Sequence, residues 1–135
     1  MIDYRIEPHI SVAEFREVLV NSTLGTRRPV DSEATLSAMI AHANLIITAR
    51  VEGRLIGVAR SLTDHVYCTY LSDLAVDERY QRKGIGKELI RRTKEATPAA
   101  KLILLSAPAA VNYYPGIGMT QWAQCYVLDH LDELK

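Results

Sequence analysis

A glycine-containing loop between a predicted strand and a predicted helix is the feature that most constrains the fold of this chain. Residues 66–76 have the apolar character of a central strand, residues 81–86 read Gln-Arg-Lys-Gly-Ile-Gly, and residues 84–96 show helical spacing of apolar positions. The first turn of a helix has backbone N–H groups without intrahelical partners, and the helix dipole adds positive charge there. Because Gly84 and Gly86 carry no side chain to block these groups, the pattern predicts an anion site, most often used for phosphate.

The spacing of the loop excludes two other phosphate-binding motifs. A P-loop requires Gly-x-x-x-x-Gly-Lys-Ser/Thr, but Gly86-Lys87 is followed by Glu88. A dinucleotide-binding fingerprint requires a third glycine after Gly86, and none follows at that spacing. Seven of the basic residues fall between positions 79 and 94, and Arg91 and Arg92 among them fit a solvated helix face. We expect the other nearby basic residues to surround the site with positive charge: Arg79, Arg82, Lys83 and Lys87.

The rest of the chain predicts antiparallel hairpins and one strand–helix–strand crossover. Ser11 and Glu14 have capping-box spacing at the start of a helix, and Gly53 marks a hairpin turn. Ser106 is expected to cap a short helix that Pro115 and Gly116 end. The predicted strands are residues 2–6, 45–51, 55–62, 66–76, 102–105 (covered on both faces) and 122–128; the predicted helices are 11–20, 31 or 32 to 42, 84–96 and 108–113.

Composition places the chain among ordinary globular proteins. A length of 135 residues predicts a single domain over 1–135. The formal net charge of zero, from 16 basic and 16 acidic residues, argues against a general nucleic-acid binder. No apolar run is long enough to span a membrane and the N-terminus has no signal pattern, so we expect a cytoplasmic protein. Cys68 and Cys125 lie in strand-like runs and predict buried free thiols, and no residue spacing indicates a metal site.

The glycine loop resembles a family motif. Gln81-x-x-Gly84-x-Gly86, preceded by Leu74-Ala-Val76, is similar to the acyl-CoA pyrophosphate loop of the GCN5-related N-acetyltransferases (GNAT). The resemblance implies an α/β fold of the α+β type: a mixed, mostly antiparallel sheet with a splayed V-shaped cleft and flanking helices. It implies acetyl-CoA as the acyl donor, and the scattered histidines and isolated cysteines predict no metal. The residues that it assigns to acyl-CoA binding are Leu74, Ala75, Val76, Gln81, Arg82, Lys83, Gly84, Ile85, Gly86, Lys87 and Asn112.

Acetyl transfer to an amine requires a hydrogen-bond donor for the thioester oxygen, proton transfers and close positioning of the reactants. The resemblance implies that the backbone N–H of Leu74 is this donor and that Val76 holds the pantetheine arm. Residues 112–119, Asn-Tyr-Tyr-Pro-Gly-Ile-Gly-Met, match the family's tyrosine region in part, and Tyr114 takes the position of the general acid. Pro115 departs from the pattern, and Tyr113 is the alternative acid.

The general base and the acceptor site stay open at this point. Asp73 is the nearest carboxylate on the central strand, although a structural role is the stronger expectation for it; His65 is a turn residue, and a base that acts through ordered water is equally open. Tyr67, Tyr70 and the loop with Arg27 and Arg28 are candidates for the acceptor site.

The first hypothesis is therefore an N-acetyltransferase that moves an acetyl group from acetyl-CoA to a primary amine, with a small molecule favoured over a protein, by direct attack in a ternary complex. The alternatives are a non-catalytic CoA-binding sensor or assembly module, and a generic nucleotide-binding domain. The resemblance is compatible with a homodimer.

Overall fold

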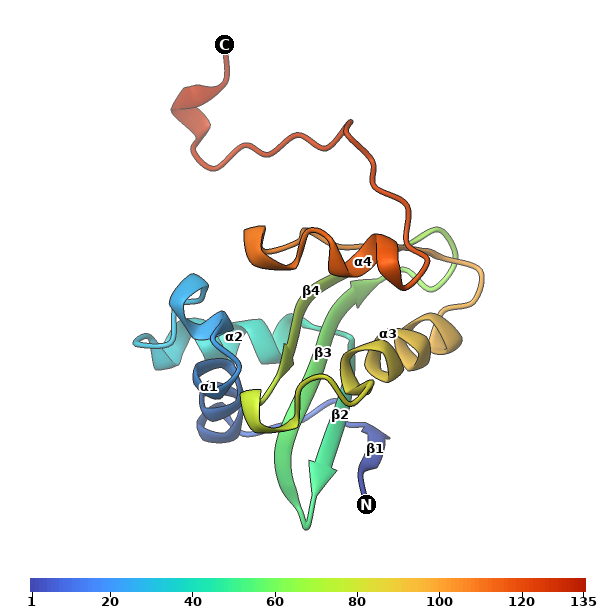
Figure 1. Ribbon diagram of the computed structural model, residues 1–135. Helices are drawn as coiled ribbons and strands as arrows, with labels where there is room; N and C mark the ends of the chain where they lie inside the picture. Colours follow the sequence, from blue (N-terminus) through green and yellow to red (C-terminus); the bar gives the residue numbers. More distant parts are fainter. The chain divides into compact units, whose positions relative to one another are not determined.

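The computed structural model describes residues 1–135, which form two compact units, residues 1–105 and 106–135. The first unit contains a five-stranded sheet and three α-helices, and the second contains one short α-helix (Figure 1). The strands are β1 (Asp3–Ile6), β2 (Leu45–Val51), β3 (Arg54–Thr63), β4 (Cys68–Val76) and β5 (Lys101–Ile103). The α-helices are α1 (Val12–Asn21), α2 (Glu33–His42), α3 (Ile85–Ala96) and α4 (Tyr113–Gly116). Four 3-10 turns are η1 (Leu24–Arg27), η2 (Glu78–Tyr80), η3 (Pro108–Ala110) and η4 (Leu131–Glu133).

The sheet confirms the predicted fold class. Its strand order is β1-β2-β3-β4-β5; the first three neighbouring pairs are antiparallel, and only β4 and β5 are parallel. Helices α1 and α2 cover one face of the sheet and α3 covers the other (Figure 1). No helix combines the length and the apolar composition that crossing a bilayer requires.

The β2–β3 hairpin turns where the sequence predicts it. Glu52 and Gly53 both have positive φ values, 50° and 81°, and connect two strands in antiparallel register. A two-residue turn of this kind matches the right-handed twist of the flanking strands, and glycine adopts it without a steric cost.

The core on the α1–α2 face is built from helix positions with 3.6-residue spacing. Phe15 and Leu19 of α1 and Leu36 of α2 are fully buried against Ile46 of β2 and Val58 of β3. At about 2 kcal/mol for each large apolar side chain, this burial is what fixes the two helices on the sheet.

The core on the opposite face depends on close approach of α3 to β3. Ile85 and Leu89 of α3 are buried there with Ile47 of β2. A Cβ atom on Gly57 would lie 3.3 Å from the Cβ of Ala49 and from a methyl carbon of Leu89. The absence of a side chain at position 57 therefore lets α3 pack directly on the strand.

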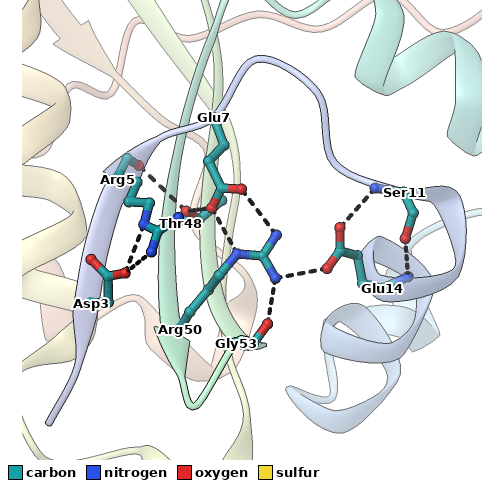
Figure 2. Close-up of polar contacts among 8 residues, drawn as sticks. All are labelled: Asp3, Arg5, Glu7, Ser11, Glu14, Thr48, Arg50 and Gly53. Atoms are coloured by element: carbon teal, nitrogen blue, oxygen red, sulfur yellow. Dashed lines mark hydrogen bonds and ion pairs between the residues drawn. The ribbon is translucent and has the colours of Figure 1, made fainter.

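A polar cluster ties the chain before and within α1 to the β2–β3 hairpin (Figure 2). Ser11 and Glu14 form the predicted capping box, in which each side chain bonds the other residue's backbone N–H. Arg50 donates two hydrogen bonds to Glu7, at 2.8 and 3.1 Å, and one each to Glu14 and the carbonyl of Gly53, both at 2.8 Å. We call Arg50, Glu7 and Glu14 the Arg50 cluster.

Two predictions for the end of the chain are wrong. Residues 122–128 form no strand: the sheet ends at β5, and without a neighbouring strand an extended segment has no ladder to bond its N–H and C=O groups. Cys125, predicted to be a buried thiol in that strand, is exposed and free, whereas Cys68 is half-buried in β4.

The predicted helix over 108–113 is also wrong in its position. A short 3-10 turn spans Pro108–Ala110 with Ala107, not Ser106, at its N-cap, and α4 begins only at Tyr113. Pro115 and Gly116 lie inside α4 and do not end the preceding turn. Pro115 is tolerated because it occupies the first turn of α4, where its missing N–H would have had no intrahelical partner.

The predicted strand over 102–105 is shorter than expected. β5 covers only three residues, Lys101–Ile103, at the edge of the sheet, and Ile103 is 44% exposed. The expectation that this strand is covered on both faces is therefore wrong.

Candidate functional site

The C-terminal half of β4 has an uncovered backbone edge. β5 pairs with only the first three residues of β4, so no strand lies beside residues 71–76 on that side. In an antiparallel pair, successive residues point their backbone groups alternately toward the partner and away from it. The N–H of Asp77 donates to the carbonyl of Ile56 (2.8 Å), and Ala75, two residues earlier, faces β3 in the same way. The backbone groups of Leu74 and Val76 therefore point toward the uncovered side.

The loop after β4 is fastened to this edge by a side chain. The Nε2 group of Gln81 donates a 2.8 Å hydrogen bond to the carbonyl of Val76. This bond agrees with the direction deduced for the Val76 backbone, and it explains why a glutamine stands at the first position of the motif. The sequence predicts Gln81 as a ligand-binding residue, and the structure places it between strand and loop.

The glycine loop presents the N-terminus of α3. Arg82 and Gly84 both have positive φ, 63° and 80°, and Gly84 is the N-cap of α3 without any side-chain cap. The first intrahelical bond runs from the N–H of Glu88 to the carbonyl of Gly84, so the N–H groups of the three residues before Glu88, including Gly86, have no partner inside the helix. A Cβ atom at position 84 would meet nothing within 4 Å. The space beside Gly84, at the start of α3, is therefore open.

The basic residues around the loop divide into free and paired side chains. Arg82 and Lys87 are exposed and form no ion pair, whereas the Nζ of Lys83 lies 5.6 Å from the centre of the Tyr80 ring. The guanidinium of Arg79 is not free, because it donates to both carboxylate oxygens of Asp77. Hydrogen bonding from the Arg79 side chain is the main cause that holds the pKa of Asp77 below its ordinary value.

The basic side chains farther along α3 form a solvated helix face, as the sequence suggests. Arg91 and Arg92 both pair with Glu88, and Arg91 also pairs with Glu95. The hydrogen bonds from these two arginines lower the pKa of Glu88 to about 2. Their charges are therefore matched within the helix.

Asp73 of β4 is a buried structural residue. Its two carboxylate oxygens accept hydrogen bonds from the Nε groups of Arg28 and Arg60, each at 2.5 Å, and its side chain is fully buried. Arg60 also bonds the carbonyl of Met39 in α2 and the hydroxyl of Ser72. Sequence reasoning missed this cluster, although an arginine inside the apolar run of β3 is a signal that could have revealed it.

Tyr113, Tyr114 and Asn112 belong to the second unit. The two tyrosine rings meet edge to face, with centroids 5.2 Å apart and planes at 79°. Burial, and secondarily the charge of Tyr113, raises the pKa of the Tyr114 hydroxyl above its ordinary value, so the group is protonated at neutral pH. The chain reverses after α4 through Gly118, whose φ is 99°, and the N–H of Met119 returns to the carbonyl of Tyr114.

The other acceptor candidates lie near the start of β4. Tyr67 and Tyr70 are exposed, and His65 occupies the turn before β4 with a φ of 69°. Asp64 organises this turn, because its carboxylate accepts from three successive backbone N–H groups. These bonds hold the pKa of Asp64 below its ordinary value.

Comparisons with known proteins show the family of the chain. A family model described as an acetyltransferase (GNAT) domain matches residues 15–131. A chloroplastic GCN5-related N-acetyltransferase of Arabidopsis thaliana is 31% identical over 70 residues, which are 50% of this chain and 27% of that protein. A histone acetyltransferase of Glycine max is 35% identical over 68 residues, 48% of this chain and 29% of that protein. The chain thus spans less than a third of the length of these curated relatives.

Solved structures share the fold along nearly the whole chain. A GNAT-family acetyltransferase of Streptococcus pneumoniae superposes with a TM-score of 0.78 at 20% identity and covers 97% of this chain and 98% of its own. An aminoglycoside N-acetyltransferase in complex with CoA has a TM-score of 0.70 at 15% identity, with 97% and 95% coverage. At such low identity these two structures are evidence for the fold alone. The family model, which spans most of the sequence, shows that the chain belongs to the GNAT acetyltransferases.

Proposed function

We propose that this protein transfers an acetyl group from acetyl-CoA to a primary amine of a small molecule. The observation that carries the proposal is the unpaired edge of β4, which leads through the loop bonded to Val76 into the uncapped N-terminus of α3. A long ligand with an acyl end and a pyrophosphate end fits a surface that offers strand donors at one end and helix N–H donors at the other.

The pyrophosphate end is assigned to the glycine loop. The N–H groups at the start of α3 donate to phosphate oxygens, and the positive φ values of Arg82 and Gly84 turn the chain so that these groups are accessible. Arg82 and Lys87, which have no ion-pair partner, supply positive charge, and Lys83 adds a third cation. Ile85 is buried and anchors the helix start, while Gln81 holds the loop to Val76.

The acyl end is assigned to β4. The N–H of Leu74 points to the uncovered side and is proposed to donate to the thioester oxygen as negative charge develops on it. Backbone groups of Ala75 and Val76 are proposed to hold the pantetheine arm, and the family resemblance alone assigns Asn112 to the same ligand. The amine nitrogen forms the new bond to the carbonyl carbon, the carbon–sulfur bond breaks, and the thiolate takes a proton, for which the family resemblance proposes Tyr114 as the donor.

The proton of the amine is proposed to leave through solvent. Asp73 does not serve as the base, because both of its carboxylate oxygens accept hydrogen bonds from arginines and the side chain is fully buried. Direct attack in a ternary complex is proposed because Cys68, the cysteine of β4, stands at the first residue of the strand, six positions from Leu74.

Thermal unfolding with acetyl-CoA tests the proposed donor, with ATP and NAD as control ligands. A ligand at a hundred times its Kd raises the free energy of unfolding by about 2.7 kcal/mol. We expect a rise in melting temperature with acetyl-CoA and none with the controls. The double variant Arg82→Gln/Lys87→Gln should weaken acetyl-CoA binding roughly tenfold through lost charge. Arg91→Gln, on the same helix but paired with glutamates, should bind normally.

Release of free thiol in the presence of an amine panel then tests turnover. No stabilisation at saturating acetyl-CoA would refute the donor assignment, and the transferase proposal with it. Stabilisation without turnover of any amine would instead favour a CoA-binding module that lacks catalysis.

A further inference from the structure

Two arginines share one carboxylate beside the proposed acyl end of β4. We call Arg28, Arg60 and Asp73 the arginine cluster. Asp73 is fully buried, Arg60 has 7% of its side chain exposed, and Arg28 has 22%. We propose that this cluster binds a carboxylate of the acceptor. The acceptor is then a free amino acid, and not an amine without a carboxylate or a polycationic amine. The inference rests on the proposed transferase function and specifies its second substrate.

The charge of the arginine cluster is the first argument. Two guanidinium groups and one carboxylate leave one positive charge in a largely buried place, and neither Asp31 nor Glu33 on the following segment forms an ion pair with either arginine. A buried charge without a partner is costly, and an anion that joins the cluster would restore the balance. The cluster therefore favours an anionic ligand and disfavours a cationic one.

The free donors of Arg28 are the second argument. Its Nε donates to Asp73, its Nη1 to the carbonyl of Arg27 and its Nη2 to the carbonyl of Ser72. A guanidinium has five N–H groups, so two remain for a ligand, and the partial exposure of Arg28 gives a ligand access to them. The neighbouring Arg27 is exposed, forms no ion pair, and adds a second positive charge next to Arg28 in the chain.

The distance to the proposed reaction centre is the third argument. Arg28 bonds the carbonyl of Ser72, which is two residues before Leu74. At about 3.3 Å per residue along a strand, the guanidinium lies within roughly 7–10 Å of the N–H that is proposed to bind the thioester oxygen. This spacing suits a molecule whose amine and carboxylate are only a few bonds apart.

A row of exposed, largely apolar side chains next to the cluster indicates that the amino acid has an apolar side chain. Leu62 of β3, Tyr70 of β4 and Ile103 of β5 are opposite one another in the sheet register, and all three are exposed. Leu62 is two residues from Arg60 on β3, so the row shares a sheet face with the arginine cluster. An amino acid with an apolar side chain would place its carboxylate on the cluster and its side chain on the row.

Matched acceptors test the inference in a thiol-release assay with acetyl-CoA. The probes are L-leucine, L-methionine and L-phenylalanine, each beside its α-carboxamide, with kanamycin and a lysine-rich peptide as cationic amines. We expect kcat/KM to be at least roughly tenfold higher for each acid than for its amide, because a charge-assisted hydrogen bond is lost with the carboxylate. Arg27→Gln and Arg28→Gln should each reduce this ratio, whereas Arg5→Gln on β1, at the other edge of the sheet, should leave it unchanged.

The outcomes separate this inference from the proposed function. Turnover of amides or cationic amines at rates equal to or above those of the acids would overturn the inference and leave the transferase intact. Thermal stabilisation by acetyl-CoA without turnover of any probe would overturn both. If Arg28→Gln does not fold, the acid-to-amide ratio of the wild type and of Arg27→Gln, whose side chain has no structural partner, still decides.

Discussion

Replacement of Arg50 by methionine tests how the N-terminal part of the chain is held to the sheet. Arg50 has only 12% of its side chain exposed and donates four hydrogen bonds, of which three go to the carboxylates of Glu7 and Glu14 (Figure 2). Methionine preserves the apolar stem but leaves two half-buried carboxylates facing each other without a cation. Removal of one partner from a buried ion pair costs about 3–5 kcal/mol. Because Glu7 and Glu14 are 20% and 29% exposed, we expect a loss of about 3 kcal/mol.

The assay is urea unfolding of wild type and variant at several pH values. The hydrogen bonds from Arg50 are the main cause that holds the pKa values of Glu7 and Glu14 below their ordinary value of 4.5. Groups with a lowered folded-state pKa stabilise the fold above the unfolded pKa, and this stabilisation is lost as the pH falls through the folded pKa. The difference in the free energy of unfolding between wild type and Arg50→Met should therefore be largest near neutral pH. It should shrink on acidification below about pH 4.5.

Arg54→Met is the matched control on the same hairpin. Arg54 pairs with Glu17, and both side chains are largely exposed (42% and 50%). Its second partner, the buried Asp77, is 3.9 Å away and keeps its two hydrogen bonds from Arg79, so the loss of Arg54 should cost less than about 1 kcal/mol. Glu7→Gln and Glu14→Gln added to Arg50→Met should recover part of the stability, since they remove the unpaired charges. A loss for Arg50→Met no larger than that of Arg54→Met, or a difference between wild type and variant that is independent of pH, would refute the reasoning.

Three further predictions concern the site and its support. Tyr114→Phe should lower kcat roughly 100-fold while the Kd of acetyl-CoA stays unchanged, as expected for loss of a general acid. Equal kcat values for wild type and Tyr114→Phe would assign the general-acid role to another group. Tyr113→Phe is the control variant. Gly57→Val should destabilise the fold by about 1–3 kcal/mol in urea unfolding, because the added atoms collide with Ala49 and Leu89; unchanged stability would contradict the close packing of α3. Asp73→Asn should cost about 3 kcal/mol in urea unfolding, since it leaves the buried guanidinium of Arg60 and the partly buried one of Arg28 without an anion. A cost below about 1 kcal/mol would contradict the arginine cluster.

The elements of the first unit could be predicted from local patterns. The capping box of Ser11 and Glu14, the turn at Gly53 and the N-cap at Gly84 are signals that act within a few residues, and each lies where the sequence places it. The apolar spacing of α1 and α3 likewise identifies the buried side chains Phe15, Leu19, Ile85 and Leu89. Such signals can be predicted from the sequence because they depend on the backbone geometry of one element.

The end of the chain shows where local patterns fail. Residues 122–128 have the composition of a strand, yet a strand forms only where a neighbour supplies the other half of the ladder. The Pro115-Gly116 pair resembles a helix end, yet it lies within the first turn of α4. In both cases the residues permit two structures, and the surrounding chain selects one.

The candidate site likewise has features that the sequence predicts and features that depend on the packing of distant elements. The sequence by itself determined the family, the glycine loop and the helix N-terminus behind it, because Gln81, Gly84 and Gly86 act on their own backbone. Only the tertiary structure decided that β5 leaves Leu74 and Val76 uncovered and that Arg28 and Arg60 meet at Asp73. These facts join residues up to 45 positions apart, as in the Arg28–Asp73 pair. Contacts of that range depend on how whole elements pack, and no local pattern encodes them.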